Sequence, residues 1–320
     1  MLKISFFSYK GGSGRTTTLF NTLPFLAEKL NASAEHPIVI FDMDYRSAGI
    51  TILLSDGKTF EVENEDSATL SAGQKHSLQY LIGNNPKCGR RLEDFKGVFA
   101  ESVGKKLGLD DNEAVLLVGA NMQYTMKVRS ENDVITILKY YLDNSLNGAS
   151  AIIFDSPSGT QVTANVSISR SDVVVCCMRP SYQFRHTTLK YLTSAVEQYA
   201  AADVKKRFVL TMTAVPVKDM VIDGRYQITA SHQDVMDTVY MLNKNAIIKN
   251  PARSRDNPII DTHMISDRNN LGIREIDRFK WNEKVNLYSI KKGGKEELSE
   301  NEVKAMARYE ELANTIVRVK

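Results

Sequence analysis

The chain has 320 residues, of which 42% are hydrophobic and 25% charged, and its 41 Lys and Arg nearly balance 38 Asp and Glu. A chain of this length and composition can bury a sizeable core, which excludes a disordered chain, a collagen-like fibre and a small disulfide scaffold. No stretch approaches the roughly 18 to 20 apolar residues of a membrane-spanning helix, and the first residues lack a signal-peptide pattern. We therefore expect a soluble, cytoplasmic protein.

Short β-branched and aromatic runs alternate with helix-like stretches along the chain, the pattern of a parallel α/β sheet. The runs are nearly continuous in apolar residues, as expected for strands that helices cover on both faces. The predicted fold class is therefore α/β, with a mostly parallel, twisted sheet between helices. We predict strands over residues 2–8, 38–41, 115–118, 151–154, 172–178 and 207–213. We predict helices over residues 16–30, 132–146, 184–200 and 300–317.

Two stretches do not fit a minimal sheet of this kind. Residues 55–113 mix acids, glycines and a hydrophilic segment, and residues 215–266 contain three prolines and little clean periodicity. We interpret both as insertions in a single domain that spans residues 1–320, because the chain contains neither an internal repeat nor a convincing linker. Insertions of such length in a compact domain are often functional.

The three cysteines, Cys88, Cys176 and Cys177, have the spacing of neither a disulfide framework nor a metal site. Cys176 and Cys177 are adjacent within a predicted strand, where successive side chains point to opposite faces. We expect all three to be buried thiols.

A glycine-rich turn joins the first predicted strand to the first predicted helix. Its residues are Lys10, Gly11, Gly12, Ser13, Gly14, Arg15, Thr16 and Thr17. Consecutive glycines let several backbone N–H groups point inward, and the helix adds its unpaired amides and the positive end of its dipole. The pattern predicts a phosphate-binding loop, with the Thr16 hydroxyl as a magnesium ligand and Thr17 reaching an inner phosphate.

Two further predicted strands end in aspartates. The run IVIF leads into Asp42 and Asp44, and the run AIIF leads into Asp155. In an open α/β sheet, ligands bind outside the carboxyl ends of the strands, so these side chains are expected to meet the phosphate loop in one crevice. Magnesium prefers oxygen ligands and retains water, which nearby carboxylates can hold. The three strand ends together predict a nucleotide–Mg²⁺ site.

The segments KGGSGRTT, FDMD and FDSPSG resemble the deviant Walker A motif, the switch-like aspartates and the Walker B motif of the ParA/MinD ATPases, a group of SIMIBI-class P-loop NTPases. The resemblance covers most of the chain. It implies a dimer that closes around two ATP molecules, with Lys10 reaching the phosphates bound by the other subunit. It also implies that Asp44 orients the attacking water, and that Asp42 and Asp155 hold the water shell of the magnesium ion.

Arg15 departs from this resemblance, because the family has lysine at the position that contacts the terminal phosphates within the same subunit. Arginine keeps the charge but is longer, planar and bulkier than lysine. We expect nucleotide binding to survive this change, whereas the ATPase activity is open between slow, altered and absent hydrolysis. The segment expected near the adenine, His263 to Asp267, also departs, so the adenine pocket is unassigned, with Met212 and Pro216 as candidates for its wall.

The function predicted first is an ATP-dependent dimerisation switch that recruits a partner protein or DNA. One alternative is a nonspecific DNA-binding partition-type ATPase, because residues 244–295 hold twelve Lys and Arg against six Asp and Glu, among them Arg253. Another is a degenerate relative that binds nucleotide with little hydrolysis. Membrane binding is disfavoured, because no basic amphipathic tail follows the last predicted helix.

Overall fold

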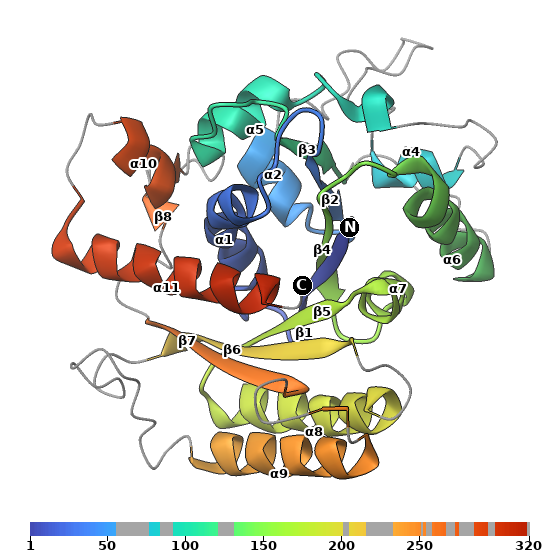
Figure 1. Cartoon of the computed structure of the whole chain (residues 1–320), viewed down its shortest axis with the longest axis vertical. Helices are drawn as coiled ribbons and strands as arrows, with labels where there is room; N and C mark the ends of the chain where they lie inside the picture. The colour runs from blue at the N-terminus through green and yellow to red at the C-terminus, as the bar shows by residue number, and fades with distance from the viewer. Residues whose placement is uncertain are drawn as a thin grey trace.

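Seven parallel strands form the main sheet of the computed structural model, in the order β3-β2-β4-β1-β5-β6-β7 (Figure 1). The strands are β1 (Leu2–Ser8), β2 (Ile38–Asp42), β3 (Val115–Val118), β4 (Ala151–Ser158), β5 (Val173–Met178), β6 (Arg207–Val215) and β7 (Ile260–Ser266). Two short strands, β8 (Ile273–Arg274) and β9 (Val285–Asn286), form a separate antiparallel pair. The structure describes residues 1–55, 77–83, 92–120, 131–200, 205–215, 233–250, 252–253, 258–266, 273–274, 285–293 and 298–318.

Helices cover both faces of this sheet (Figure 1). One face carries α1 (Arg15–Lys29), α2 (Gly49–Ser55), α5 (Ala100–Leu107), α10 (Leu287–Gly293) and α11 (Glu300–Val317). The other carries α4 (Leu78–Gly83), α6 (Glu131–Tyr140), α7 (Val162–Arg170), α8 (Tyr182–Tyr199) and α9 (Gln233–Lys249). A 3-10 helix over Leu92–Phe95 and a π-helical turn over Tyr141–Ser145 complete the described helical segments. The predicted α/β fold class is confirmed.

Side chains of the buried strands alternate between two parts of the core. Cys177 of β5 packs in the cluster that includes α1 and α11, whereas Cys176 packs in the cluster that includes α8 and α9. Both are buried free thiols, as predicted, and Cys88 lies outside the described residues. Apolar side chains on both faces explain why the strand sequences are nearly continuous in apolar residues.

All six predicted strands and four predicted helices are present, with ends that differ by a few residues. The sequence pattern missed the helices α2, α7 and α10, and it also missed α9 and β7, which lie within the stretch 215–266. Their positions relative to proline explain the miss: α9 ends at Lys249, before Pro251, and β7 begins after Pro258. Proline disfavours the helical conformation of the residue before it and removes a backbone donor, so these prolines flank the two elements.

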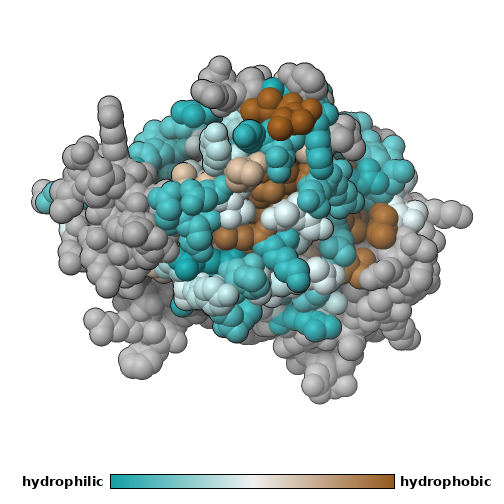
Figure 2. Space-filling model, turned by 90° about the horizontal axis from the view of Figure 1, so that it is seen from below, coloured by the Kyte–Doolittle hydropathy of each residue, from teal (hydrophilic) through white to brown (hydrophobic). Residues whose placement is uncertain are grey.

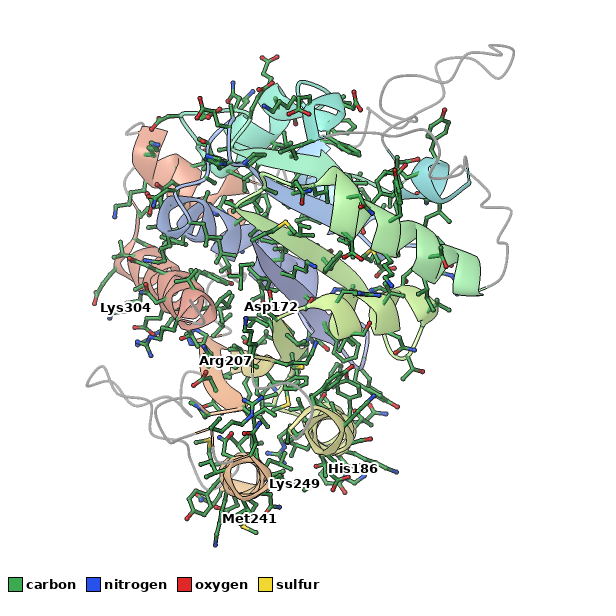
Figure 3. All side chains as sticks on the ribbon, turned by 45° about the vertical axis from the view of Figure 1, so that its right-hand side comes forward. Asp172, His186, Arg207, Met241, Lys249 and Lys304 are labelled. Atoms are coloured by element: carbon green, nitrogen blue, oxygen red, sulfur yellow. The ribbon has the colours of Figure 1, made fainter. Side chains whose placement is uncertain are left out.

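Helices α8 and α9 lie side by side as an outer layer next to β5 and β6 (Figures 1 and 3). Arg185 Nη1 of α8 lies 3.6 Å from Asp234 Oδ1 of α9. The surface that this layer presents is largely hydrophilic, with separate hydrophobic patches (Figure 2). Met241 and Ile248 of α9 are 50% and 69% exposed. Within the described part of the chain, no helix combines the length and apolar character needed to cross a membrane.

Helix α1 contains a proline whose effect on the backbone is compensated from elsewhere. Pro24 has no N–H, so the carbonyl of Phe20, four residues earlier, lacks its helical donor. Asn286 of β9 donates its Nδ2 to Phe20 O at 2.8 Å and accepts the Tyr288 N–H at 2.9 Å through Oδ1. Because Asn286 is only 1% exposed, water cannot replace it easily. β9 therefore fastens the helix that follows the glycine-rich turn.

Replacing Asn286 with alanine should lower the free energy of unfolding by about 1–3 kcal/mol, because the buried Phe20 carbonyl loses a donor. In a Pro24→Ala background the alanine N–H can supply that donor, so the same replacement should cost clearly less. Urea unfolding of the four proteins measures this coupling. An equal loss in both backgrounds would show that Asn286 does not act through the proline.

Helix α11 begins with a capping box and is held to β7 by a buried histidine. Ser299 donates its N–H to Glu302 Oε2 at 2.8 Å, and Ser299 Oγ accepts the Glu302 N–H. His263 Nε2 lies 2.8 Å from Arg308 O, and since a carbonyl only accepts, Nε2 carries the proton. Burial lowers the pKa of His263 to about 4, and the hydrogen bond to Arg308 opposes this only in part.

This lowered pKa sets the sign of a pH effect on stability. The unfolded chain takes up a proton at His263 near pH 6.5, and the folded chain does so only near pH 4. The contribution of neutral His263 to the free energy of unfolding is therefore complete above about pH 6.5 and is lost as the pH falls toward 4. Glutamine at position 263 keeps an amide donor but does not titrate. Between about pH 7 and pH 4.5, wild type should lose about 1–3 kcal/mol more unfolding free energy than His263→Gln. The free energy of unfolding of both proteins is measured by urea denaturation at each pH. An equal change with pH in wild type and in His263→Gln would contradict this prediction.

Candidate functional site

The glycine-rich turn follows β1 and is shaped by two residues with left-handed backbone. Gly12 has φ +76° and Gly14 has φ +73°, and Gly14 is the N-cap of α1. A Cβ at Gly12 would meet nothing within 4 Å, so backbone strain, rather than space, favours glycine there. Ser13 Oγ donates to Lys10 O at 2.6 Å, and Thr213 Oγ1 of β6 donates to Ser13 O at 2.6 Å. The turn is therefore fixed between β1, β6 and α1.

The first turn of α1 is open to an anion. No side chain caps its N-terminus and its first turn contains no acidic residue, so no carboxylate of the helix itself competes for its first N–H groups and the positive end of its dipole. Gly11 and Gly12 are exposed and Thr17 is half-buried. This is the arrangement that binds phosphate at a helix N-terminus.

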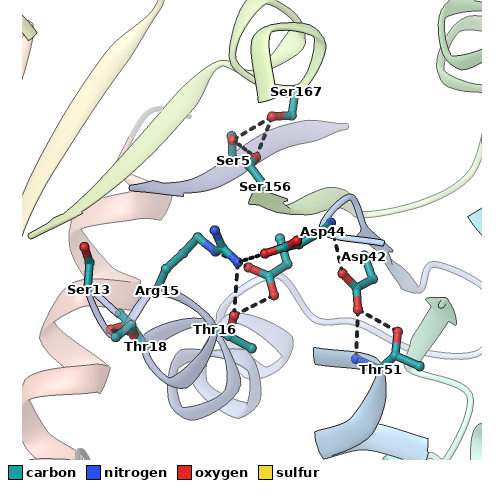
Figure 4. Close-up of polar contacts among 12 residues, drawn as sticks. Ser5, Ser13, Arg15, Thr16, Thr18, Asp42, Asp44, Thr51, Ser156 and Ser167 are labelled. Atoms are coloured by element: carbon teal, nitrogen blue, oxygen red, sulfur yellow. Dashed lines mark hydrogen bonds and ion pairs between the residues drawn. The ribbon is translucent and has the colours of Figure 1, made fainter. Parts of the chain in front are cut away.

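Two of the three predicted aspartates lie opposite each other on neighbouring strands. Asp42 ends β2 and pairs in register with Asp155 of β4, and both carboxyl groups are fully buried. Asp44 follows two residues after Asp42, and its side chain is 17% exposed. The parallel sheet thus brings residues more than a hundred positions apart in sequence together on its carboxyl-terminal side, next to the start of α1 (Figure 4).

Arg15 and Thr16, the first residues of α1, bind this carboxylate group. Arg15 Nε donates to Asp155 Oδ1 at 2.7 Å, and Arg15 Nη2 donates to Asp44 Oδ2 at 2.9 Å (Figure 4). Thr16 Oγ1 donates to Asp155 Oδ2 at 2.8 Å. The Arg15 residue is only 8% exposed. The guanidinium therefore joins the ends of two strands to the first turn of the helix.

Asp42 has different donors. Thr51 of α2 donates both its N–H, at 3.1 Å, and its Oγ1, at 2.7 Å, to Asp42 Oδ2, while the Asp44 N–H donates to Oδ1 at 3.1 Å. Burial, followed by the charge of Asp155, raises the pKa of Asp42 to about 8 despite the hydrogen bonds from Thr51. Thr51 Oγ1 also accepts the Ala120 N–H at 2.8 Å, which ties the end of β3 to the site.

Lys10 lies apart from the carboxylates. Its Nζ is 5.8 Å from the centre of the Phe184 ring, in the first turn of α8. This distance is within the range of a cation–π contact. The two cations of the turn therefore point to different places, Arg15 into the strand ends and Lys10 toward α8.

The charges and hydrogen-bond donors at the carboxyl ends of β2 and β4 indicate how a magnesium ion would fit there. Arg15 pairs with Asp44 and Asp155 but not with Asp42. Burial, and after it the charge of Asp155, raises the pKa of Asp42, and a cation bound nearby would oppose this shift. The described residues contain no group of three His, Cys, Asp or Glu placed to hold a metal directly. The set of one hydroxyl and nearby carboxylates therefore fits a magnesium ion that keeps water and phosphate oxygens as ligands, and not a fully protein-bound ion.

The structure brings together Arg15, Thr16, Asp44 and Asp155, and it places Asp42 beside them. Sequence reasoning missed Thr51, Thr213 and Phe184, because a lone threonine or phenylalanine carries no motif and only the fold brings each to the site. Met212 is fully buried in the core of the α8 and α9 side, so it cannot form the wall of an open pocket. Pro216 and Asp267 lie outside the described residues.

No protein-family model matches the chain, and no curated protein matches it either. Solved structures do match. The septum site-determining protein MinD of Pyrococcus horikoshii OT3, complexed with Mg-ADP, is 16% identical, with 100% of this chain and 97% of that chain covered and a TM-score of 0.52. A plasmid partition protein of Borrelia burgdorferi B31 bound to AMPPNP is 14% identical, with 99% of both chains covered and a TM-score of 0.54.

A McdA variant of Cyanothece in complex with ATP is also similar, with 15% identity, 100% of this chain and 97% of that chain covered, and a TM-score of 0.54. Identities this low show a shared fold alone, here with MinD, the plasmid partition protein and McdA. The resemblance seen in the three sequence motifs thus extends to the fold of the chain.

Thr51 provides a test of how this edge is held together. Replacing Thr51 with valine removes a donor to the buried Asp42 and leaves the Ala120 N–H without its acceptor, so unfolding should become about 1–3 kcal/mol easier. Thr51→Ser keeps the hydroxyl and should lose less than half as much. Chemical denaturation of both variants measures the difference. Equal losses would mean that the threonine methyl group, and not its hydroxyl, stabilises the edge.

Proposed function

We propose that this protein binds ATP with Mg²⁺ and acts as a nucleotide-dependent dimerisation switch that recruits a partner protein. The observation that carries the proposal is the convergence of the glycine-rich turn and the start of α1 with Thr16, Asp44 and Asp155 at one edge of the sheet. The similar structures were solved with Mg-ADP, AMPPNP or ATP, which supports nucleotide as the ligand. We further propose that residues 1–320 work as one domain.

Each side chain has a role in this proposal. The backbone N–H groups of residues 11–17 hold the phosphates, and Thr17 reaches an inner phosphate. The Thr16 hydroxyl ligates the magnesium ion, while Asp155 and Asp42 hold its water shell. The bound ion would neutralise charge on the phosphates. Asp44 orients the attacking water once its carboxylate is available.

Lys10 is the residue proposed to act between subunits. It lies at the rim of the turn and is not paired with the carboxylates, and its neighbour is a ring rather than an anion. A lysine on such a contact can extend toward phosphates of a second subunit at small cost, because a partly exposed cation–π contact is weak, about 0.5–1 kcal/mol. Charge delivered between the transferring and leaving groups favours hydrolysis.

DNA binding has less support among the described residues. Arg253 is 1% exposed and donates its Nη2 to Lys206 O at 3.0 Å, so it cannot contact DNA at the surface. The described lysines of the basic stretch lie on α9 and on α10, which pack on opposite faces of the sheet (Figure 1). They do not form one basic patch, so we favour a protein partner over DNA.

The proposal is tested by titration calorimetry with a non-hydrolysable ATP analogue and Mg²⁺, together with light scattering. Wild type should bind the analogue and dimerise with it. Lys10→Ala should bind with an affinity within about threefold of wild type but stay monomeric, because the lysine acts on the other subunit's phosphates.

Thr16→Val should lower the affinity in the presence of Mg²⁺ by about tenfold or more, because the hydroxyl ligand is gone. Lys304→Ala, a change of an exposed lysine on α11, is the matched control for Lys10→Ala and should behave like wild type. The absence of binding heat from wild type would refute nucleotide binding. Dimerisation of Lys10→Ala would refute the cross-subunit role.

A further inference from the structure

Arg15 contacts side chains that the proposed function assigns to the magnesium ion and to the attacking water. Its Nη2 is 2.9 Å from Asp44 Oδ2 and 3.4 Å from Thr16 Oγ1, and its Nε is 2.7 Å from Asp155 Oδ1. The guanidinium thus approaches an oxygen of three of the four side chains that the proposed function assigns to the metal or to the attacking water, and Asp42 is the exception. Figure 4 shows the guanidinium beside Asp44 and Thr16.

Two cations cannot share these oxygens without repelling each other. The site is buried, with Asp155 fully inaccessible and Arg15 8% exposed, so solvent screens the repulsion poorly. Asp155 Oδ1 and Asp44 Oδ2 already accept N–H groups of Arg15, and Asp155 Oδ2 accepts the Thr16 hydroxyl that would have to turn toward a metal ion. We therefore expect that Arg15 paired with these carboxylates and a bound magnesium ion exclude each other.

This contact also depends on arginine rather than lysine. The carboxylates belong to different segments, Asp155 to β4 and Asp44 to the residues after β2, and one guanidinium reaches both through two separate nitrogens. A lysine ammonium is a single point charge on a flexible stem, without the fixed fork that holds two carboxylates in one geometry.

We propose that Arg15 is a latch: in the ligand-free protein it holds Asp44 and Asp155, and the metal–nucleotide complex loads only when the guanidinium leaves them. This inference rests on the proposed nucleotide function and adds regulation to it. While Asp44 is paired with Arg15, its carboxylate is unavailable to orient water. Movement of Arg15 toward the phosphates therefore frees Asp44 when the metal–nucleotide complex binds. Because only the unlatched fraction binds, the latch weakens the apparent affinity.

A double-mutant cycle with a non-hydrolysable ATP analogue and Mg²⁺ tests the latch by calorimetry. Asp44→Asn removes one anchor of Arg15, so it should raise the affinity at least about fivefold when Arg15 is present. In an Arg15→Ala background there is no latch to open, and the same change should alter the affinity by less than about twofold. Arg15→Lys should bind more tightly than wild type, because it keeps a charge for the phosphates but not the fork.

Asp143→Asn is the matched charge control, because Asp143 is an exposed carboxylate that precedes β4, at the opposite edge of the sheet. It should leave the affinity unchanged in both backgrounds. An equal gain from Asp44→Asn with and without Arg15 would overturn the latch, since it would show only the loss of a negative charge. A lower affinity of Asp44→Asn, seen only with Arg15, would mean that the pair assists binding, which also overturns it.

Unfolding of the same four ligand-free proteins separates this inference from the proposed function. Arg15→Ala and Asp44→Asn should be coupled in the ligand-free state, each change costing less when the other is present. If no variant binds nucleotide, the proposed function fails, and this coupling still decides whether Arg15 holds Asp44. Additive losses would show that the contact has no energetic role and would overturn the latch without affecting nucleotide binding.

Discussion

The burial of Asp42 and Asp155 at the carboxyl ends of two neighbouring strands is the constraint on which the site depends. A buried carboxylate is costly unless donors surround it. Asp42 obtains its donors from Thr51 of α2, and Asp155 obtains them from Arg15 and Thr16 at the start of α1. The need to satisfy these two groups therefore fixes where two helices begin relative to the sheet.

The glycine-rich turn is held from the other side by groups that carry no charge. Thr213 reaches from β6 to the Ser13 carbonyl, and the left-handed conformations of Gly12 and Gly14 aim the backbone into the first turn of α1. Asn286 supplies the donor that Pro24 removes further along the same helix. The amides at the start of α1 are thus set in place before any ligand arrives, which reduces the ordering that binding would require.

The two cations of the turn differ in what surrounds them, and this difference bears on function. Arg15 is enclosed by carboxylates, whereas Lys10 rests near the Phe184 ring at the rim. The strong pairs hold Arg15 within its own subunit, and the weak contact leaves Lys10 able to reach outward. In the proposed dimer, Arg15 would therefore act within its own subunit, whereas Lys10 would reach the other subunit.

The sequence by itself determined the alternation of strands and helices, the glycine-rich turn before α1 and the aspartates near strand ends, because each depends on local periodicity or on a short motif. It did not reveal the helices α2, α7 and α10, nor α9 and β7, which lie next to prolines. Only the tertiary structure decided that Arg15 turns into the carboxylates, that Thr51 and Thr213 join the site, and that Arg253 is buried. These features depend on contacts between residues distant in sequence, and the direction of a long side chain is set by the charges that folding brings within its reach.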